Sequence, residues 1–319
     1  MMKASSVLFI VGLALAGPDK GIAVAQNYPA KPVRIVTSEA GGGADLITRL
    51  AAQGLAPALG QQVIVENRAS ALTGEFVANA APDGYTLLIN GSSIWISSLF
   101  RKTAYDPVQD LAPITLVSRT PNIVVVHPSL PVKSIRDLIA LAKARPGELN
   151  YASAGPGGAP HLSAELFKSM AGINVVGVTY RGNGPSVNAL ISGEVHMMIS
   201  TAGSVASQLG SRRLNALAVT SAQPSILFPG LPTVAAAGLP GYETEATYGA
   251  FAPARTPPAI VSRLNRDLTR YLVSAEARER FVKAGLESAA NTPEQLASLV
   301  GSDLQKLGKV IRDAGLRVE

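Results

Sequence analysis

Short apolar runs rich in β-branched residues alternate with segments of helical period along most of the chain. The runs, each typical of a buried strand, span residues 33–37, 62–66, 86–90, 123–127, 174–178, 195–200 and 214–220. Two of the intervening segments, 45–59 and 162–170, repeat apolar residues at the spacing of one helix face. Strands that alternate with helices predict an α/β fold with mostly parallel sheets.

The helical segments also predict which side chains pack on a sheet. In the first helix these are Leu46, Ile47, Leu50, Ala51 and Leu55, and in the second they are Leu162, Leu166, Phe167 and Met170. From Pro257 onward the pattern is helical throughout, over residues 260–273, 275–284 and 293–314. We expect these last helices to pack back on the first part of the chain.

The length of the chain predicts two lobes. Roughly 290 residues remain after the N-terminal segment described below, which exceeds a typical single domain. The sequence shows no internal repeat and no low-complexity linker, so the lobes should be joined by ordered crossings, predicted at 113–122 and 244–253. We therefore assign residues 26–118 and 247–319 to lobe 1 and residues 119–246 to lobe 2.

Residues 1–25 have the organisation of a signal peptide. Lys3 precedes an apolar stretch from Val7 to Ala16, and Ala23-Val24-Ala25 offers a cleavage site of small residues. The apolar stretch, roughly 10 residues long, is about half of what a membrane-spanning helix needs. The chain has no cysteine, so it forms no disulfide and carries no cysteine for a lipid anchor. We expect cleavage after Ala25 and a mature protein in the periplasm.

The charge of the chain is mildly basic. Removing residues 1–25 changes the 28 basic and 22 acidic side chains to 26 and 21, so the net charge of +6 becomes +5. Apart from Arg212-Arg213 the basic residues are scattered, with few aromatic residues between them. No nucleic-acid partner is therefore expected, whereas a mild positive charge suits an anionic small molecule.

A glycine-rich turn after the first strand is the first candidate ligand site. It comprises Ser38, Glu39, Ala40, Gly41, Gly42 and Gly43, with Asp45 in the helix that follows. Glycines let backbone N–H groups approach a ligand, and a helix start favours an anion. The turn lacks the third glycine of a dinucleotide fingerprint and the Gly-Lys-Ser/Thr of a phosphate loop. A tight turn in which Asp45 only complements the helix dipole is the alternative interpretation.

A second glycine-rich turn lies about 110 residues further along. It contains Ser153, Ala154, Gly155, Gly157 and Gly158, and His161 opens the next predicted helix. Ligands of open α/β sheets bind outside the carboxyl ends of the strands, so both turns should open on one crevice. Ser92 and Ser93 end the strand at 86–90 and are added as lining hydroxyls, although serines there are also ordinary turn residues.

The sequence contains no recognisable catalytic set. It lacks a cysteine nucleophile, no serine lies in a G-x-S-x-G motif, and neither turn holds paired acids. The three histidines, His127, His161 and His196, do not have the spacing of a metal site. We therefore expect no enzymatic activity, no metal and no cofactor, with His127 and His196 in structural roles.

Motifs over nearly the whole mature chain resemble the Bug, or TctC-like, family of substrate-binding proteins of tripartite tricarboxylate transporters. They occupy residues 28–36, 41–45, 65–68, 81–88, 149–153, 217–221, 232–234 and 238–243. The resemblance implies a type II periplasmic-binding-protein fold, with two α/β lobes that close around a ligand cleft. It also implies a monomer that captures a small organic carboxylate for integral membrane transporter subunits. A carboxylate-sensing receptor for a two-component system and a periplasmic hydrolase are the alternatives.

The chain departs from the family pattern at the turns themselves. Thr37 to Gly42 replaces a Pro-Phe-Ala-Pro-Gly-Gly type of loop and adds Glu39, which points either into the cleft or to solvent. Residues 155–158 read Gly-Pro-Gly-Gly where Gly-Asn-Gly-Thr/Ser is common. Ser200 stands where the family usually has an aspartate, and we include it among the candidate ligand residues. The identity of the carboxylate is not inherited from any relative. Trp95, the only tryptophan, follows Ser92 and Ser93 and is expected near the cleft.

Overall fold

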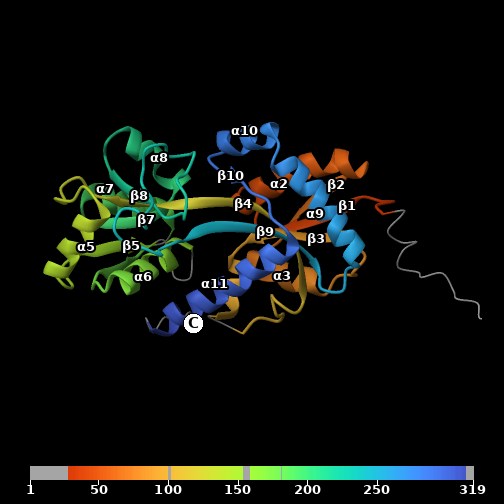
Figure 1. Ribbon diagram of the computed structural model, residues 1–319, viewed down its shortest axis with the longest axis horizontal. Coiled ribbons are helices and arrows are strands. Elements are labelled where there is room, and N and C mark those ends of the chain that lie inside the picture. The colour runs from red at the N-terminus through yellow and green to blue at the C-terminus, as the bar shows by residue number, and fades with distance from the viewer. Residues whose placement is uncertain (1–27, 100–101, 154–158, 181, 314–319) are drawn as a thin grey trace, which may run out of the picture.

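Two sets of strands and helices, joined by two long strands in the middle, make up the molecule (Figure 1). The computed structural model describes residues 28–99, 102–153, 159–180 and 182–313. Helices and strands alternate through most of this range, and the strands form one curled sheet. This mixed α/β architecture confirms the predicted fold class.

The first set is a parallel sheet that carries the first glycine-rich turn. Its strands are β1 (Val33–Thr37), β2 (Val63–Asn67) and β3 (Thr86–Gly91), in the order β2-β1-β3. The connecting helices are α2 (Gly43–Leu59) and α3 (Ser70–Ala78), followed after β3 by the short α4 (Ser93–Ile96) and the 3₁₀ turn η1 (Ser97–Leu99). α2 ends at Gly60, whose φ of 64° is a left-handed conformation that glycine adopts without strain.

The second set has the same alternation with shorter strands. Its strands are β5 (Asn150–Ser153), β6 (Val176–Thr179), β7 (Met197–Thr201) and β8 (Asn215–Val219). Its helices are α5 (Ile135–Ala144), α6 (Ala159–Ala171), α7 (Asn183–Ser192) and α8 (Ala202–Gly210). β5 is parallel to both β6 and β7, as helix crossovers require.

The two sets are joined by the long antiparallel strands β4 (Leu111–Val126) and β9 (Glu245–Pro253). The first part of β4 pairs with β9, which pairs in turn with β3, while residues Asn122 to Val126 of β4 pair with β7 and β8. Continuous strands thus run through both predicted crossings. The proposed lobe boundaries at 118 and 246 fall inside these strands, so the division into lobes stays a prediction.

Three helices and a short strand complete the chain. They are α9 (Pro258–Leu272), α10 (Ala275–Lys283), β10 (Glu287–Ser288) and α11 (Pro293–Asp313). α9 and α10 lie beside α2, on one face of the first sheet. α11 lies on the other face and also contacts α6 of the second set (Figure 1). The last helix therefore packs against both parts of the molecule, not only against the first.

The helix faces differ from the sequence prediction at two positions. Leu46 is 42% exposed and Met170 is 39% exposed, although both were expected to face a sheet. The buried stripe of α2 instead includes Ile47, Ala51 and Leu55. Leu46 precedes Ile47 by about 100° around the helix axis, which takes it outside that stripe.

Candidate functional site

Four helices begin within a few residues of a strand end: α2 after β1, α6 after β5, α7 after β6 and α8 after β7. The strand register sets the two groups of ends opposite one another. Gly91 at the end of β3 pairs with Tyr248, which pairs with Ser118, while Thr201 at the end of β7 pairs with Asn122. Ser118 and Asn122 are roughly 13 Å apart along β4. We call this the strand-end region, and helix starts with free N–H groups suit it to an anion.

The turn after β1 is held by the carboxylate of Asp45. This carboxylate accepts hydrogen bonds from the backbone N–H of Gly41 and from Nδ2 of Asn67, both at 2.9 Å. It also forms an ion pair with Arg49 at 2.9 Å. The Arg49 hydrogen bond, together with those from Asn67 and Gly41, lowers the pKa of Asp45 to about 2. Asp45 is therefore an internal anchor of the turn, and its charge is already satisfied.

Two positions of this turn favour glycine for different reasons: Gly41 because of its backbone conformation, and Gly43 because of a close neighbour. Gly41 has a φ of 80°, a left-handed conformation that side chains rarely adopt. A Cβ on Gly43 would lie 3.1 Å from the hydroxyl oxygen of Tyr248, so a side chain there would crowd the start of α2. Asn67 completes the turn, because its Nδ2 also donates to the carbonyl of Ser38 at 2.7 Å. The predicted residues from Ser38 to Asp45 are thus gathered on one braced loop.

Glu39 is directed to the neighbouring helix α3. Its Oε1 accepts a 2.8 Å hydrogen bond from the backbone N–H of Ser70, the first residue of that helix. This bond lowers the pKa of Glu39, so the side chain stays ionised at neutral pH. Glu39 thus accepts a hydrogen bond from one of the N–H groups that a helix start leaves unpaired.

Tyr248 is a site candidate that the sequence analysis missed. It lies in β9, with its ring 3.3 Å from where a Cβ of Gly91 would be and its hydroxyl near Gly43. The hydroxyl makes no hydrogen bond to any described residue, and burial raises its pKa, so at neutral pH it keeps its proton. The sequence predicted a crossing here, but not a strand, and only strand pairing brings this ring to the first turn.

The structure describes only some of the candidate ligand residues in the second set of strands and helices. Ser153 is buried at the end of β5, and His161 in α6 is partly buried, which lowers its pKa. Ala154, Gly155, Gly157 and Gly158 lie outside the described residues. Ser200 is fully buried in β7, and its hydroxyl has no hydrogen-bond partner among the described residues.

Ser92, Ser93 and Trp95 follow the end of β3, the strand beside β1. Ser92 lines a hollow of about 90 Å³ between α6 and α11, whereas Ser93 lines a different hollow beside α3. Trp95 has no exposed surface, and its Nε1 donates to Oδ2 of Asp303 at 3.0 Å. The tryptophan is therefore a core side chain, although Asp303 connects it to the cavity that Ser92 lines.

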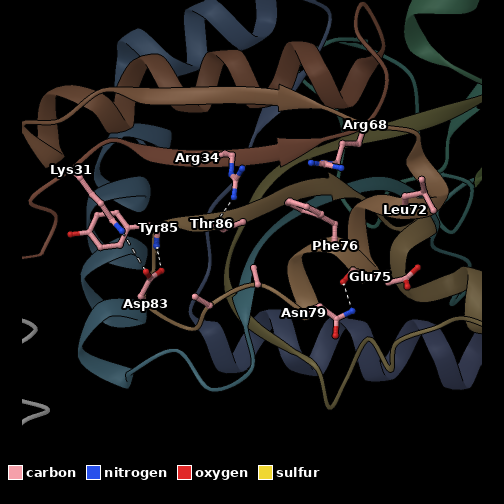
Figure 2. Close-up of a pocket in the computed structure, with 12 residues that line it drawn as sticks. Lys31, Arg34, Arg68, Leu72, Glu75, Phe76, Asn79, Asp83, Tyr85 and Thr86 are labelled. Carbon is pink, nitrogen blue, oxygen red and sulfur yellow. Dashed lines mark hydrogen bonds and ion pairs between the residues drawn. The ribbon is translucent and has the colours of Figure 1, made fainter.

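A hollow of about 800 Å³ lies beside α3 and the first sheet (Figure 2). Arg34 and Arg68 both form ion pairs with Glu66, at 3.0 and 2.6 Å. Arg68 also stacks on Phe76, with 3.6 Å between the guanidinium carbon and the ring centre. None of the predicted site residues lines this hollow, and its arginines already share a carboxylate. We therefore assign it no part in ligand capture.

Neither a metal cluster nor a membrane span is found in the part of the chain that the structure describes. Within those residues no three His, Cys, Asp or Glu side chains are grouped so that they could hold an ion. The described helices also include none that is long and apolar enough to cross a membrane.

Comparison with known proteins identifies the family. A family model described as "Tripartite tricarboxylate transporter family receptor" (TctC) matches residues 47–316. The chain belongs to the TctC family. A relative in Bordetella pertussis, "Protein BugT", is 34% identical over 328 residues, which cover 100% of both chains. Membership of a family of receptors agrees with the sequence prediction.

Solved structures of similar proteins share this fold. One, "R. palustris Rpa4515 with adipate", has a TM-score of 0.74 and 34% sequence identity, and the match covers 91% of this chain and 99% of that one. Another, "MatC (Rpa3494) from Rhodopseudomonas palustris with bound malate", has a TM-score of 0.69 and 29% identity, with coverage of 89% and 100%. Both names include a dicarboxylate, adipate or malate. Helix starts favour negatively charged groups, so a region with several helix starts is electrostatically suited to this class of ligand.

Proposed function

We propose that this protein captures a small organic carboxylate in the periplasm and delivers it to the integral membrane subunits of a tripartite tricarboxylate-type transporter. It acts as a monomeric binding protein without catalytic activity. The ligand lies in the strand-end region, against the turn from Ser38 to Gly43 and the first residues of α6, α7 and α8.

The observation that carries the proposal is the meeting of helix starts from two parts of the chain at opposed strand ends. Each helix start offers unpaired backbone N–H groups, which recognise a carboxylate without a charged side chain. In the first turn the one acid at the helix start, Asp45, is already neutralised by Arg49 and by hydrogen bonds. Asp45 takes the N–H of Gly41, and the N–H of Gly42 donates to the carbonyl of Glu39. The N–H groups of Gly43 and Ala44 are therefore the ones left for an incoming anion. The dicarboxylates in the names of two structural relatives support the same class of ligand.

A thermal-shift screen of aliphatic diacids, hydroxy acids, aromatic acids and amino acids tests the proposal. A ligand at about 100 times its Kd should stabilise the folded state by about 2.7 kcal/mol. Calorimetry on each hit should then give one site per chain. If no carboxylate in the panel stabilises the protein, or if a hit is consumed during the titration, the proposal is wrong.

Removing the hydroxyl of Tyr248 should weaken carboxylate binding. The hydroxyl has no partner among the described residues and lies beside Gly43, so it is free to donate to a bound carboxylate. A hydrogen bond to a charged group contributes about 1.5–3 kcal/mol, so Tyr248→Phe should raise the Kd at least about tenfold in calorimetry. Tyr271→Phe is the matched control, because that ring packs against Gly54 of α2. Equal Kd values for both variants would place the Tyr248 hydroxyl outside the site.

The charge of Glu39, in contrast, should matter little. Glu39 is exposed and its carboxylate is engaged by the N–H of Ser70, which keeps it at the start of α3. Interactions between exposed charges are weak and screened by salt. Glu39→Gln should therefore change the Kd of dicarboxylates and of amino acids by less than about threefold in low-salt calorimetry. A large gain for dicarboxylates with a loss for amino acids would mean that Glu39 turns toward the ligand.

A further inference from the structure

The outer edge of β2 carries unpaired backbone groups. β2 lies at one end of the strand order, and among the described residues it pairs only with β1. The carbonyl of Gln62 and the N–H of Arg68 bond to β1. Alternate residues of a strand direct their backbone groups to opposite edges, so those of Val63, Val65 and Asn67 point away from β1. Such an edge is a template for a further strand.

β2 lacks the features that commonly protect an edge strand. Its sequence, Val-Ile-Val-Glu-Asn, contains neither lysine nor proline, and its register with β1 runs without a bulge. Ile64 in the middle of the strand is 50% exposed. An unprotected edge strand with an exposed apolar side chain favours pairing with another chain. The kind of partner that fits this edge is therefore an extended segment.

A hollow of about 460 Å³ lies along the same edge, between β2 and α2. Its walls include Val63, Ile64 and Val65 from the strand, and Arg49, Ala52 and Ala56 from the helix. The helix residues are three or four positions apart, so they lie on one face of α2. The small side chains of the two alanines leave room beside the strand. A segment that pairs with β2 would place alternate side chains in this hollow.

The hollow is connected to the glycine-rich turn of the proposed carboxylate site. Arg49, in its wall, forms the ion pair with Asp45 and also donates to Oδ1 of Asn67 at 3.1 Å. Asn67 ends β2 and donates in turn to Asp45 and to the carbonyl of Ser38. A partner segment on β2 therefore lies next to the residues that brace the turn. This is a suitable position for a protein that receives the bound carboxylate.

Building on the proposed function, we propose that the outer edge of β2 and this hollow dock an extended segment of the transporter's integral membrane subunits. The segment adds to the sheet as a further strand. Main-chain hydrogen bonds to Val63 and Val65 hold it, and the hollow selects small or apolar side chains at its alternate positions. Docking leaves the carboxylate site itself open, because the edge residues do not line the first turn.

Uptake measurements in native host cells that lack the chromosomal gene test this docking edge. The substrate is the acid that binds most tightly in the thermal-shift screen, in radiolabelled form. Ile64→Lys places a charge in the apolar contact, and Val63→Pro removes an outward N–H at the first residue of the strand, where an edge strand tolerates proline. Each should lower uptake at least about tenfold, while the Kd of the purified variant for that acid stays within about twofold of the wild type.

Val176→Lys is the matched control. Val176 lies in β6, at the other end of the strand order, and is 47% exposed. This variant should keep wild-type uptake. If Val63→Pro melts far below the wild type, Ile64→Lys decides alone, because Ile64 is exposed. Wild-type uptake by Ile64→Lys, an equal loss in Val176→Lys, or a raised Kd in Ile64→Lys would overturn the docking edge.

Photocrosslinking identifies the occupant without any carboxylate. p-Benzoylphenylalanine incorporated in place of Ile64 should crosslink in host cells to an integral membrane subunit of the transporter, identified by mass spectrometry. The same group in place of Val176 should not. A crosslink to a second copy of this chain would make the edge a dimer interface and overturn the proposal. If no acid in the panel binds the wild type, the proposed function is wrong, and the crosslink alone decides on the edge.

Discussion

Substitution of Gly43 by valine should abolish carboxylate binding while the protein remains folded. Gly43 is the first residue of α2, and its N–H is among those that a helix start leaves unpaired. A Cβ there would lie 3.1 Å from the Tyr248 hydroxyl, and the two methyl groups of valine would occupy space at the turn. We expect the Kd to rise at least about 100-fold, equivalent to about 2.7 kcal/mol, in calorimetry with a ligand from the screen.

Gly301→Val is the matched control for this prediction. Gly301 is exposed in α11, and a Cβ added there meets no atom within 4 Å. Both variants should melt within a few degrees of the wild type, because neither substitution removes a buried side chain. A Gly43→Val variant that is folded and binds with wild-type affinity would place the ligand away from the start of α2.

Replacement of Asp45 by asparagine should destabilise the protein at neutral pH and much less in acid. The neutral side chain loses the ion pair with Arg49, while the hydrogen bonds that brace Gly41 and Asn67 are weakened. Folding lowers the pKa of Asp45 from 3.8 to about 2. At pH 7 this shift corresponds to roughly 2 kcal/mol of stability that Asp45→Asn should lose. Urea denaturation at a series of pH values measures the difference.

The sign of this pH dependence follows from the lowered pKa. The carboxylate of Asp45 stabilises the folded state fully above about pH 5, where it is ionised both folded and unfolded. This contribution is lost as the pH falls toward 2, so the gap between wild type and Asp45→Asn should close over that range. Glu148→Gln, an exposed substitution, should show no gap at any pH. A constant gap from pH 7 to pH 2 would mean that the Asp45 charge does not hold the turn.

The architecture was largely predictable because it depends on local patterns. The apolar runs at 33–37 and 86–90 became β1 and β3, and the helical period after Pro257 became α9 to α11. The prediction failed at a polar strand. β9 contains Thr247 and Gly249 among its apolar positions, so it does not produce a long apolar run. β9 was predicted as a crossing, though not as a strand, because its apolar faces are defined only by its partners β3 and β4.

The glycine-rich turns, the absence of cysteine chemistry and the family can be recognised in the sequence, since the motifs that carry them are runs of consecutive residues. The contacts around these turns depend on the tertiary structure. The hydroxyl of Tyr248 lies beside Gly43 because β9 pairs with β3, a strand more than 150 residues away in the sequence. The carboxylate of Glu39 accepts a hydrogen bond from the N–H of Ser70, which is 31 residues further along the chain. The hollow along the edge of β2 likewise requires β2 and α2 together. Such contacts depend on how distant segments pack, and no local pattern of residue types encodes that packing.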